Sequence, residues 1–476
     1  MIKGKNVKGL IWSFTDNFLQ QIVNFVIGIV LSRLLLPEEF GVLGIISVFI
    51  AFANTFVNSG LSDALINKKD AIDIDYYTVF WANVGLGLFT FVILFTIAPF
   101  AALFFGLPSL TFLIRFSAVS IVIVSLASIQ RTILTKSVDF KKITIVSIIA
   151  VVTSGVVAVV MALNNYGVVS LVVRMVLGQV LTLILFWLIN SWRPKLQFDV
   201  SSFKQMYKFG SKLFMSRLLT SIYDNLYYLV IGKFFSHKNL GYYTRAESFR
   251  NLATINITSS VQRVSFSILS SKQGTPEQIV VFKKFLTGTF FITSLFITIL
   301  FGNANEIILI LIGDKWLPSV EYLKILSISG LFVPLYFINL NLLAANGNTS
   351  LYFKLELFTK FFSIPTIIIG LGFGILPMLY AMIFSSLTAY VVSVIAVNKL
   401  FGFSYKQQIS LIARGITLFI ISIGLVAVFN YVLPVQNIYF KAIRNILLIF
   451  LTFGASLMYV FPDLLHEIKN IKRNQK

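Results

Sequence analysis

The stretch TVFWANVGLGLFTFVILFTIAPFAALF at residues 78–104 contains no charged residue. As an α-helix it would be about 40 Å long, which exceeds the roughly 30 Å hydrocarbon core of a bilayer. Runs of this kind recur along the whole chain. Inside a bilayer each backbone N–H and C=O must be paired within the protein, which favours helices. We therefore expect an all-α membrane protein.

The composition agrees with this expectation and excludes several classes of enzyme. Hydrophobic residues make up 57% of the chain and charged residues 12%, and the mean hydropathy is +0.88. There is no cysteine, which excludes disulfides, thiolate metal sites and cysteine nucleophiles. The two histidines, His237 and His466, are far apart, and no nucleotide-binding loop or GxSxG motif is present. We expect neither an enzyme nor a bound cofactor.

Apolar runs separated by charged or Gly/Pro/Asn-rich turns predict about fourteen transmembrane helices. Their ranges are 12–35, 40–62, 78–104, 109–130, 143–163, 167–190, 210–232, 246–270, 284–302, 320–343, 352–373, 375–398, 409–431 and 441–461. Most basic residues then fall in alternate loops and in both termini, which predicts that both termini are cytoplasmic. The net charge of +21 thus mainly encodes orientation and predicts no nucleic-acid partner.

Two short motifs indicate an internal repeat. Residues 33–41 (RLLLPEEFG) and 233–241 (KFFSHKNLG) share a basic residue, large apolar residues, a turn and an apolar-Gly pair. Leu-Pro-Ser at 107–109 recurs at 317–319, and a basic residue follows each copy in the next helix. The offsets are nearly equal and predict two six-helix lobes in parallel orientation. We expect an N-terminal lobe at 1–190, a cytoplasmic linker at 191–209, a C-terminal lobe at 210–400, and two extra helices with a basic cytoplasmic tail at 401–476.

Polar residues lie at helical spacing on the corresponding helices of the two lobes. The first predicted helix carries Asp16, Gln20 and Asn24, and the second carries Asn54 and Asn58. In the other lobe, the helices at 210–232 and 246–270 carry similar stripes, which include Gln262. Such groups can line a substrate cavity, and they can equally join helices by hydrogen bonds.

Ionisable residues within predicted spans point more directly to function, because a charge in the membrane is costly. The set consists of Asp16, Arg115, Arg174, Arg217, Asp224, Arg263 and Lys324. Basic residues outnumber acidic ones, and arginine binds phosphate or carboxylate through two parallel hydrogen bonds. The sequence thus predicts a cavity for an anionic ligand, lined by the five basic residues together with Asn54, Asn58 and Gln262. As an alternative, Arg115, Arg174 and Arg263 extend to the membrane interface.

Four further basic residues are expected on the outer side: Arg33, Lys233, Arg245 and Arg250. They predict a basic outer vestibule, and contacts with lipid headgroups are the alternative explanation.

Several motifs resemble those of Wzx-type polysaccharide flippases, which belong to the polysaccharide transport family of the multidrug/oligosaccharidyl-lipid/polysaccharide exporter superfamily. They are GLIWS at 9–13, Gln20-Gln21, LSRLLLPEEFG at 31–41, NSGL at 58–61, ALI at 64–66, TVFW at 78–81, Asp139-Phe140, LGYYTRA at 240–246 and IGDKW at 312–316. The likeness covers residues 5 to 400 approximately. Within the family, the chain most resembles the colanic-acid and lipopolysaccharide exporter subgroup.

This resemblance implies a flippase of the bacterial inner membrane that carries undecaprenyl-pyrophosphate-linked oligosaccharide outward by alternating access. Membrane lipids and other polysaccharide assembly proteins are the further partners that it implies. Asp16 and Asp224 are candidates for coupling to H⁺ or Na⁺, because an intramembrane carboxylate can change its charge.

Two alternatives remain open at this point. A multidrug exporter of the same superfamily would need an acidic pocket for cationic drugs, whereas the intramembrane charges here are mainly basic. A membrane-embedded polysaccharide polymerase or ligase would usually carry a long extramembrane loop, and the predicted loops are short.

Overall fold

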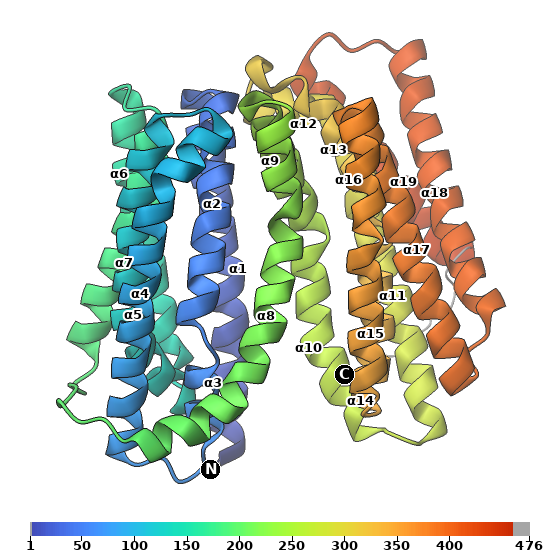
Figure 1. Cartoon of the computed structure of the whole chain (residues 1–476). Helices are drawn as coiled ribbons and strands as arrows, with labels where there is room; N and C mark the ends of the chain where they lie inside the picture. Colours follow the sequence, from blue (N-terminus) through green and yellow to red (C-terminus); the bar gives the residue numbers. More distant parts are fainter. Residues whose placement is uncertain (1, 460–476) are drawn as a thin grey trace. The chain divides into compact units, whose positions relative to one another are not determined.

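The computed structural model describes residues 2–459, and over this range it consists of α-helices and one short 3-10 helix without any strand (Figure 1). The chain forms two compact units, Met1–Gly241 and Tyr242–Lys476. Eleven helical segments of the described chain, two of which combine two successive helices, are long and apolar enough to cross a membrane, and α1 adds the shorter apolar segment Phe18–Leu34. The predicted fold class, an all-α membrane protein, is confirmed.

Unit 1 contains eight helices and the first residues of a ninth. These are α1 (Ile2–Leu34), α2 (Pro37–Val57), α3 (Leu61–Asn67), α4 (Asp73–Phe105), α5 (Ser109–Lys136), α6 (Phe140–Leu163), α7 (Val168–Ile189), α8 (Val200–Phe234) and the start of α9 (His237–Ala253). Long helices pack side by side, with α4 against α5, α1 against α6, and α7 against both α5 and α6.

Unit 2 contains the rest of α9 and the helices that follow. These are α10 (Ile255–Ser271), α11 (Pro276–Gly302), α12 (Ala304–Leu311), η1 (Asp314–Trp316), α13 (Ser319–Gly330), α14 (Val333–Ala345), α15 (Thr349–Phe361), α16 (Ser363–Phe373), α17 (Ile375–Phe401), α18 (Tyr405–Val432) and α19 (Ile438–Tyr459). Its core is the α13–α14 segment, which packs against α10, α11 and α17.

Each of the fourteen predicted helices coincides with one or two observed helices over the residues that the structure describes, and prolines explain two of the pairs. The helices predicted at 320–343 and 352–373 are each interrupted, at Leu331–Phe332 and at Phe362. Pro334 and Pro365 follow these breaks closely. A proline has no N–H to donate and collides with the carbonyl four residues before it, so the helix breaks there.

Several boundaries differ from the prediction, and two of these differences bear on the polar contacts of unit 1. The helix predicted at 40–62 ends at Val57, because Gly60 has φ +84° and a new helix, α3, begins at Leu61. Residues 200–209 of the predicted linker form the start of α8, where the backbone N–H of Ser202 donates to the Asp199 carboxylate at 2.6 Å. This helix packs against α2, α3 and α4, and it therefore lies in compact unit 1. The division into six-helix lobes stays a prediction.

Candidate functional site

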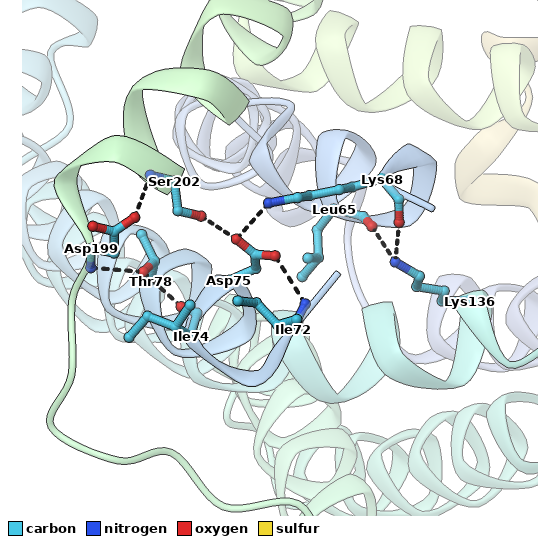
Figure 2. A network of polar contacts seen from close by, with 9 residues as sticks. All are labelled: Leu65, Lys68, Ile72, Ile74, Asp75, Thr78, Lys136, Asp199 and Ser202. Atoms are coloured by element: carbon cyan, nitrogen blue, oxygen red, sulfur yellow. Dashed lines mark hydrogen bonds and ion pairs between the residues drawn. The ribbon is translucent and has the colours of Figure 1, made fainter. Parts of the chain in front are cut away.

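Asp75, in the first turn of α4, is the centre of a polar network in unit 1 (Figure 2). It is 1% exposed. Its Oδ1 accepts hydrogen bonds from Lys68 Nζ at 2.8 Å and from Ser202 Oγ, and its Oδ2 accepts one from the Ile72 backbone N–H at 3.0 Å. The donors come from the end of α3, the start of α8 and the turn before α4. One buried carboxylate therefore joins three segments of the chain.

Lys136, at the end of α5, extends the network to a fourth segment (Figure 2). Its Nζ donates to the backbone carbonyl of Leu65 at 2.8 Å and to that of Lys68 at 2.6 Å. Carbonyls at the end of a helix have no partner within the helix, and a cation there is favourable. Lys136 thus fixes the end of α3 against α5.

The segment between α7 and α8 is held on α4 and α5 by aromatic side chains and backbone contacts. Trp192 stacks on Tyr77 with 5.7 Å between ring centroids, and its carbonyl accepts a hydrogen bond from Gln130 Nε2 at 3.1 Å. Trp81 Nε1 donates to the Lys195 carbonyl at 2.8 Å. This part of the predicted linker is therefore anchored to unit 1 along its length.

Further along α8, two glycines allow the helix to approach the α2–α3 turn closely. A Cβ on Gly60 would lie 2.6 Å from the Gly210 carbonyl oxygen, which leaves no space for a side chain. Nearby, Arg217 Nη1 forms an ion pair with Asp63 Oδ2 at 2.8 Å and donates to the Asn58 carbonyl at 3.2 Å. The structure therefore brings the predicted residues Arg217 and Asn58 together. It adds Asp63, whose carboxylate compensates the charge of Arg217.

The two copies of the first repeat motif meet near the other end of α8. A Cβ on Gly41 would lie 1.8 Å from the carbonyl oxygen of His237, and a Cβ on Gly241 would lie 1.8 Å from that of Pro37. The glycine that ends each copy thus contacts the middle residue of the other copy: Gly41 contacts His237, and Gly241 contacts Pro37. A two-fold relation between the copies produces this kind of self-complementary contact.

Charged side chains flank the same contact. Glu38 Oε1 and Lys238 Nζ, which occupy equivalent positions of the two copies, form an ion pair at 3.4 Å. Burial lowers the pKa of His237, although a hydrogen bond with the Phe105 backbone raises it in part. An imidazolium is therefore disfavoured at this position.

Arg174 on α7 reaches the predicted polar stripe of α1. Its Nη2 donates to Asn24 Oδ1 at 2.5 Å, and the residue is partly buried. Because the partner is a neutral amide, this hydrogen bond leaves the positive charge of Arg174 uncompensated. Two residues that the sequence assigned to different polar sets are here in direct contact.

Arg115 and Lys324, the basic residues after the Leu-Pro-Ser motifs, occupy similar places in the two units. The motifs begin α5 and α13, with Pro108 and Pro318 just before the first helical residue. Arg115 Cζ lies 4.2 Å from the ring centroid of Phe95, and Lys324 Nζ lies 5.9 Å from that of Phe301. Each cation contacts an aromatic face on the preceding long helix, α4 or α11. This contact contributes about 0.5–1 kcal/mol at exposed sites.

The predicted vestibule residues belong to both units. Lys233, in unit 1, donates to the Phe104 carbonyl and lies 4.4 Å from the Phe104 ring centroid. In unit 2, Arg250 Nη2 pairs with Glu247 at 3.3 Å and donates to Asn251 Oδ1 at 2.8 Å. Arg33 is exposed on unit 1, and Arg245 is partly buried in unit 2. Their grouping into one vestibule stays a prediction.

The remaining predicted residues are placed as follows. Asn54 lies on α2, where its carbonyl accepts the Asn58 N–H at 2.8 Å. On α10, Arg263 is exposed and the Gln262 carbonyl accepts a hydrogen bond from Asn341 Nδ2 at 2.8 Å. Asp224 is exposed on α8. The side chain of Asp16 lies outside the described residues.

A sequence model of the family described as "Polysaccharide biosynthesis protein" matches residues 30–321. The chain belongs to this family. It is 28% identical over 308 residues to the teichuronic acid biosynthesis protein TuaB of Bacillus subtilis, and this match covers 63% of this chain and 63% of TuaB. It is 25% identical over 421 residues to the lipopolysaccharide biosynthesis protein WzxC of Escherichia coli, which covers 86% of this chain and 84% of WzxC.

The fold of this polysaccharide biosynthesis family member is similar to that of a solved membrane protein. The lipid II flippase MurJ in an inward closed conformation superimposes with a TM-score of 0.77, over 96% of this chain and 100% of that chain. The two sequences are 17% identical, so this likeness shows the fold alone. The resemblance to polysaccharide biosynthesis proteins such as WzxC that the sequence motifs indicate is confirmed by the family match and by these relatives.

Proposed function

We propose that the chain carries undecaprenyl-pyrophosphate-linked oligosaccharide from the cytoplasmic to the periplasmic leaflet of the bacterial inner membrane. The cargo would be a repeat unit of O-antigen, capsule or exopolysaccharide, and transport would proceed by alternating access. Membership of the polysaccharide biosynthesis family and the fold of a lipid II flippase support this proposal.

The contact between Arg174 and Asn24 carries the proposal. Arg174 lies six residues after the start of α7, about 9 Å into the helix, where an ionised group is costly unless it faces a polar space or a partner. Its hydrogen bond directs the guanidinium onto the polar stripe of α1. A guanidinium that stays ionised and has further N–H groups to donate suits the oxygens of a pyrophosphate.

Two finer parts belong to the proposal. Both termini would be cytoplasmic, as the distribution of basic residues predicts. Asp224 on α8 and Asp16 on α1 would respond to a coupling ion, H⁺ or Na⁺. If Asp16→Asn and Asp224→Asn both retain full, gradient-dependent transport in vesicles, these residues have no part in coupling.

Deletion of the gene in its host tests the proposed function. We expect lipid-linked oligosaccharide to accumulate on the inner leaflet and the surface polysaccharide to be lost. Wild-type chain should restore export, whereas Arg174→Gln should restore less than a tenth of it, because one charge-assisted hydrogen bond to phosphate is worth about 1.5–3 kcal/mol. Lys399→Gln, an exposed position at the end of α17, is the control and should restore full export.

The same strains separate the proposal from a multidrug exporter. A deletion strain that exports its polysaccharide normally and becomes sensitive to cationic drugs would support that alternative. Full export by the Arg174→Gln variant, with normal amounts of protein in the membrane, would remove Arg174 from the transport path.

A further inference from the structure

A basic cavity of about 220 Å³ lies in unit 2 between α11 and α18. Lys283, Lys406 and Arg414 line it. The remaining lining residues supply polar groups and an apolar floor: Thr287, Gln407, Ser410, Leu286, Phe403 and Leu411. Among the described residues, the lining thus contains three cations, three neutral polar side chains and no carboxylate.

Helical spacing explains why these side chains converge. On α11, Lys283 and Thr287 are four residues apart, and on α18 Gln407, Ser410 and Arg414 are at i, i+3 and i+7. Each set lies on one face of its helix, and the two helices pack against each other. The sequence of both helices therefore directs polar and basic groups into the same cavity.

This chemistry fits the phosphate of a lipid headgroup. Arginine and lysine side chains are good donors to phosphate oxygens. Lys406 lies in the first turn of α18, whereas Lys283 and Arg414 lie seven and nine residues after the starts of α11 and α18. All three cations are therefore within about 14 Å of a helix end. Basic cavities between transmembrane helices at the cytoplasmic side hold anionic headgroups, and the positive-inside bias predicts that side for these helix ends.

The surface of α18 beyond Arg414 favours a lipid over a free phosphate ion. Ile421 and Val428 follow Arg414 at intervals of seven residues, on the same face, and are 49% and 56% exposed. A Cβ on Gly424, between them, would meet no atom within 4 Å. An exposed apolar strip therefore continues from the basic cavity toward the middle of the membrane, where an acyl chain would lie.

We propose that this cavity binds the headgroup of an anionic phospholipid, with the phosphate between Lys283, Lys406 and Arg414 and an acyl chain along Ile421 and Val428. The three cations of the site come from α11 and α18, and the site does not depend on the proposed transport function. A bound lipid stabilises the folded chain by mass action, because it binds the packed α11–α18 pair better than the separated helices.

Native mass spectrometry of the purified full chain in detergent tests this site. The probes are phosphatidylglycerol, phosphatidylcholine and inorganic phosphate. We expect phosphatidylglycerol to bind more tightly than phosphatidylcholine, and Lys283→Gln or Arg414→Gln to weaken its binding about fivefold each. Lys284→Gln is the matched control, because Lys284 is the neighbouring exposed lysine on α11 and does not line the cavity. It should change binding less than twofold.

Three results would overturn the proposal. The first is binding of phosphatidylcholine as tight as that of phosphatidylglycerol, and the second is a loss of phosphatidylglycerol binding in the Lys284→Gln variant as large as in the Lys283 and Arg414 variants. The third is complete displacement of phosphatidylglycerol by inorganic phosphate, which would indicate a site for the free ion. The melting temperature of each variant without added lipid shows whether it is folded. Because Lys283 and Arg414 are exposed, these values should equal that of the wild type. If a variant nevertheless melts early, Lys406→Gln replaces it in the comparison.

Discussion

Arg217 shows why charges counted along a sequence need their partners in space. The sequence places Arg217 within a helix and counts it toward a surplus of positive charge. In the structure its guanidinium forms an ion pair with Asp63, which lies on α3 just beyond α2. This pair reduces the surplus available to a ligand, whereas Arg174 contacts the neutral amide of Asn24. Of the two, Arg174 is the better candidate to contact an anionic cargo.

The Arg217–Asp63 pair gives a prediction at the scale of single residues. We expect Arg217→Gln and Asp63→Asn to reduce export by similar amounts, because each breaks the same link between α8 and α3. Both side chains are more than one third exposed, so their coupling in stability should be no more than about 1 kcal/mol. The measurement compares polysaccharide export by the two single variants with export by a double variant in which the charges are exchanged, Arg217→Asp with Asp63→Arg. Partial recovery in the exchange supports the link, and an exchange as defective as the worse single variant contradicts it.

At the scale of elements, the close contacts of glycine are the least tolerant feature of unit 1. Gly41 and Gly241 each face a backbone carbonyl, which cannot move aside as a flexible side chain can. The repeat motif predicts that these glycines are equivalent, and each of them contacts the same position of the other copy. The starts of α2 and α9 can therefore approach each other only while both positions lack a side chain.

We expect Gly41→Ala and Gly241→Ala to separate the starts of α2 and α9, at a cost of about 3 kcal/mol or more in stability. Gly85→Ala is the control, because a Cβ at Gly85 on α4 meets nothing within 4 Å. The melting temperature of the purified protein is the measurement. A control that is as destabilised as the two test variants would show that steric exclusion at this contact is not the cause.

The Asp75 network predicts a second effect on the same unit. Asp75→Asn removes the charge that holds Lys68 and weakens the bond with Ser202 at the start of α8. Breaking a buried pair costs about 3–5 kcal/mol, and the partial exposure of Lys68 reduces this to about 2 kcal/mol. Asp73→Asn, in the same turn but exposed, is the control. Limited proteolysis between α7 and α8 should become faster only in the Asp75 variant, and equal rates would contradict this role.

At the scale of the whole molecule, composition and apolar periodicity were enough to predict the helical membrane fold. The bilayer imposes helices of a minimum length, and each predicted span coincides with observed helices. The short helix α3 could not be predicted in this way, because its seven residues show no clear period. Two partners of charged residues could not be predicted either, since Asp63 meets Arg217 and Asp75 meets Ser202 from distant parts of the sequence. A sequence signal for Asp75 did exist, because an acidic residue at the start of a helix often caps it.

Orientation can be measured directly because the chain has no cysteine of its own. The distribution of basic residues predicts that Lys69 faces the cytoplasm and that Tyr166 faces the periplasm. In intact cells, a membrane-impermeant maleimide should label the Tyr166→Cys variant and leave Lys69→Cys unlabelled until the inner membrane is opened. Both positions are exposed, so access is not limited by packing. The opposite labelling pattern would contradict the predicted cytoplasmic position of both termini.

The most direct test of the central claim is a transport measurement on the purified chain in liposomes. Undecaprenyl-pyrophosphate-linked oligosaccharide is placed in one leaflet, and its appearance in the other is followed with an enzyme that acts only on the exposed sugar. We expect wild-type chain to move the lipid faster than empty liposomes do, and Arg174→Gln to lose at least nine tenths of that rate while Lys399→Gln keeps it. A wild-type rate equal to that of empty liposomes, with and without an imposed H⁺ or Na⁺ gradient, would contradict the proposed function.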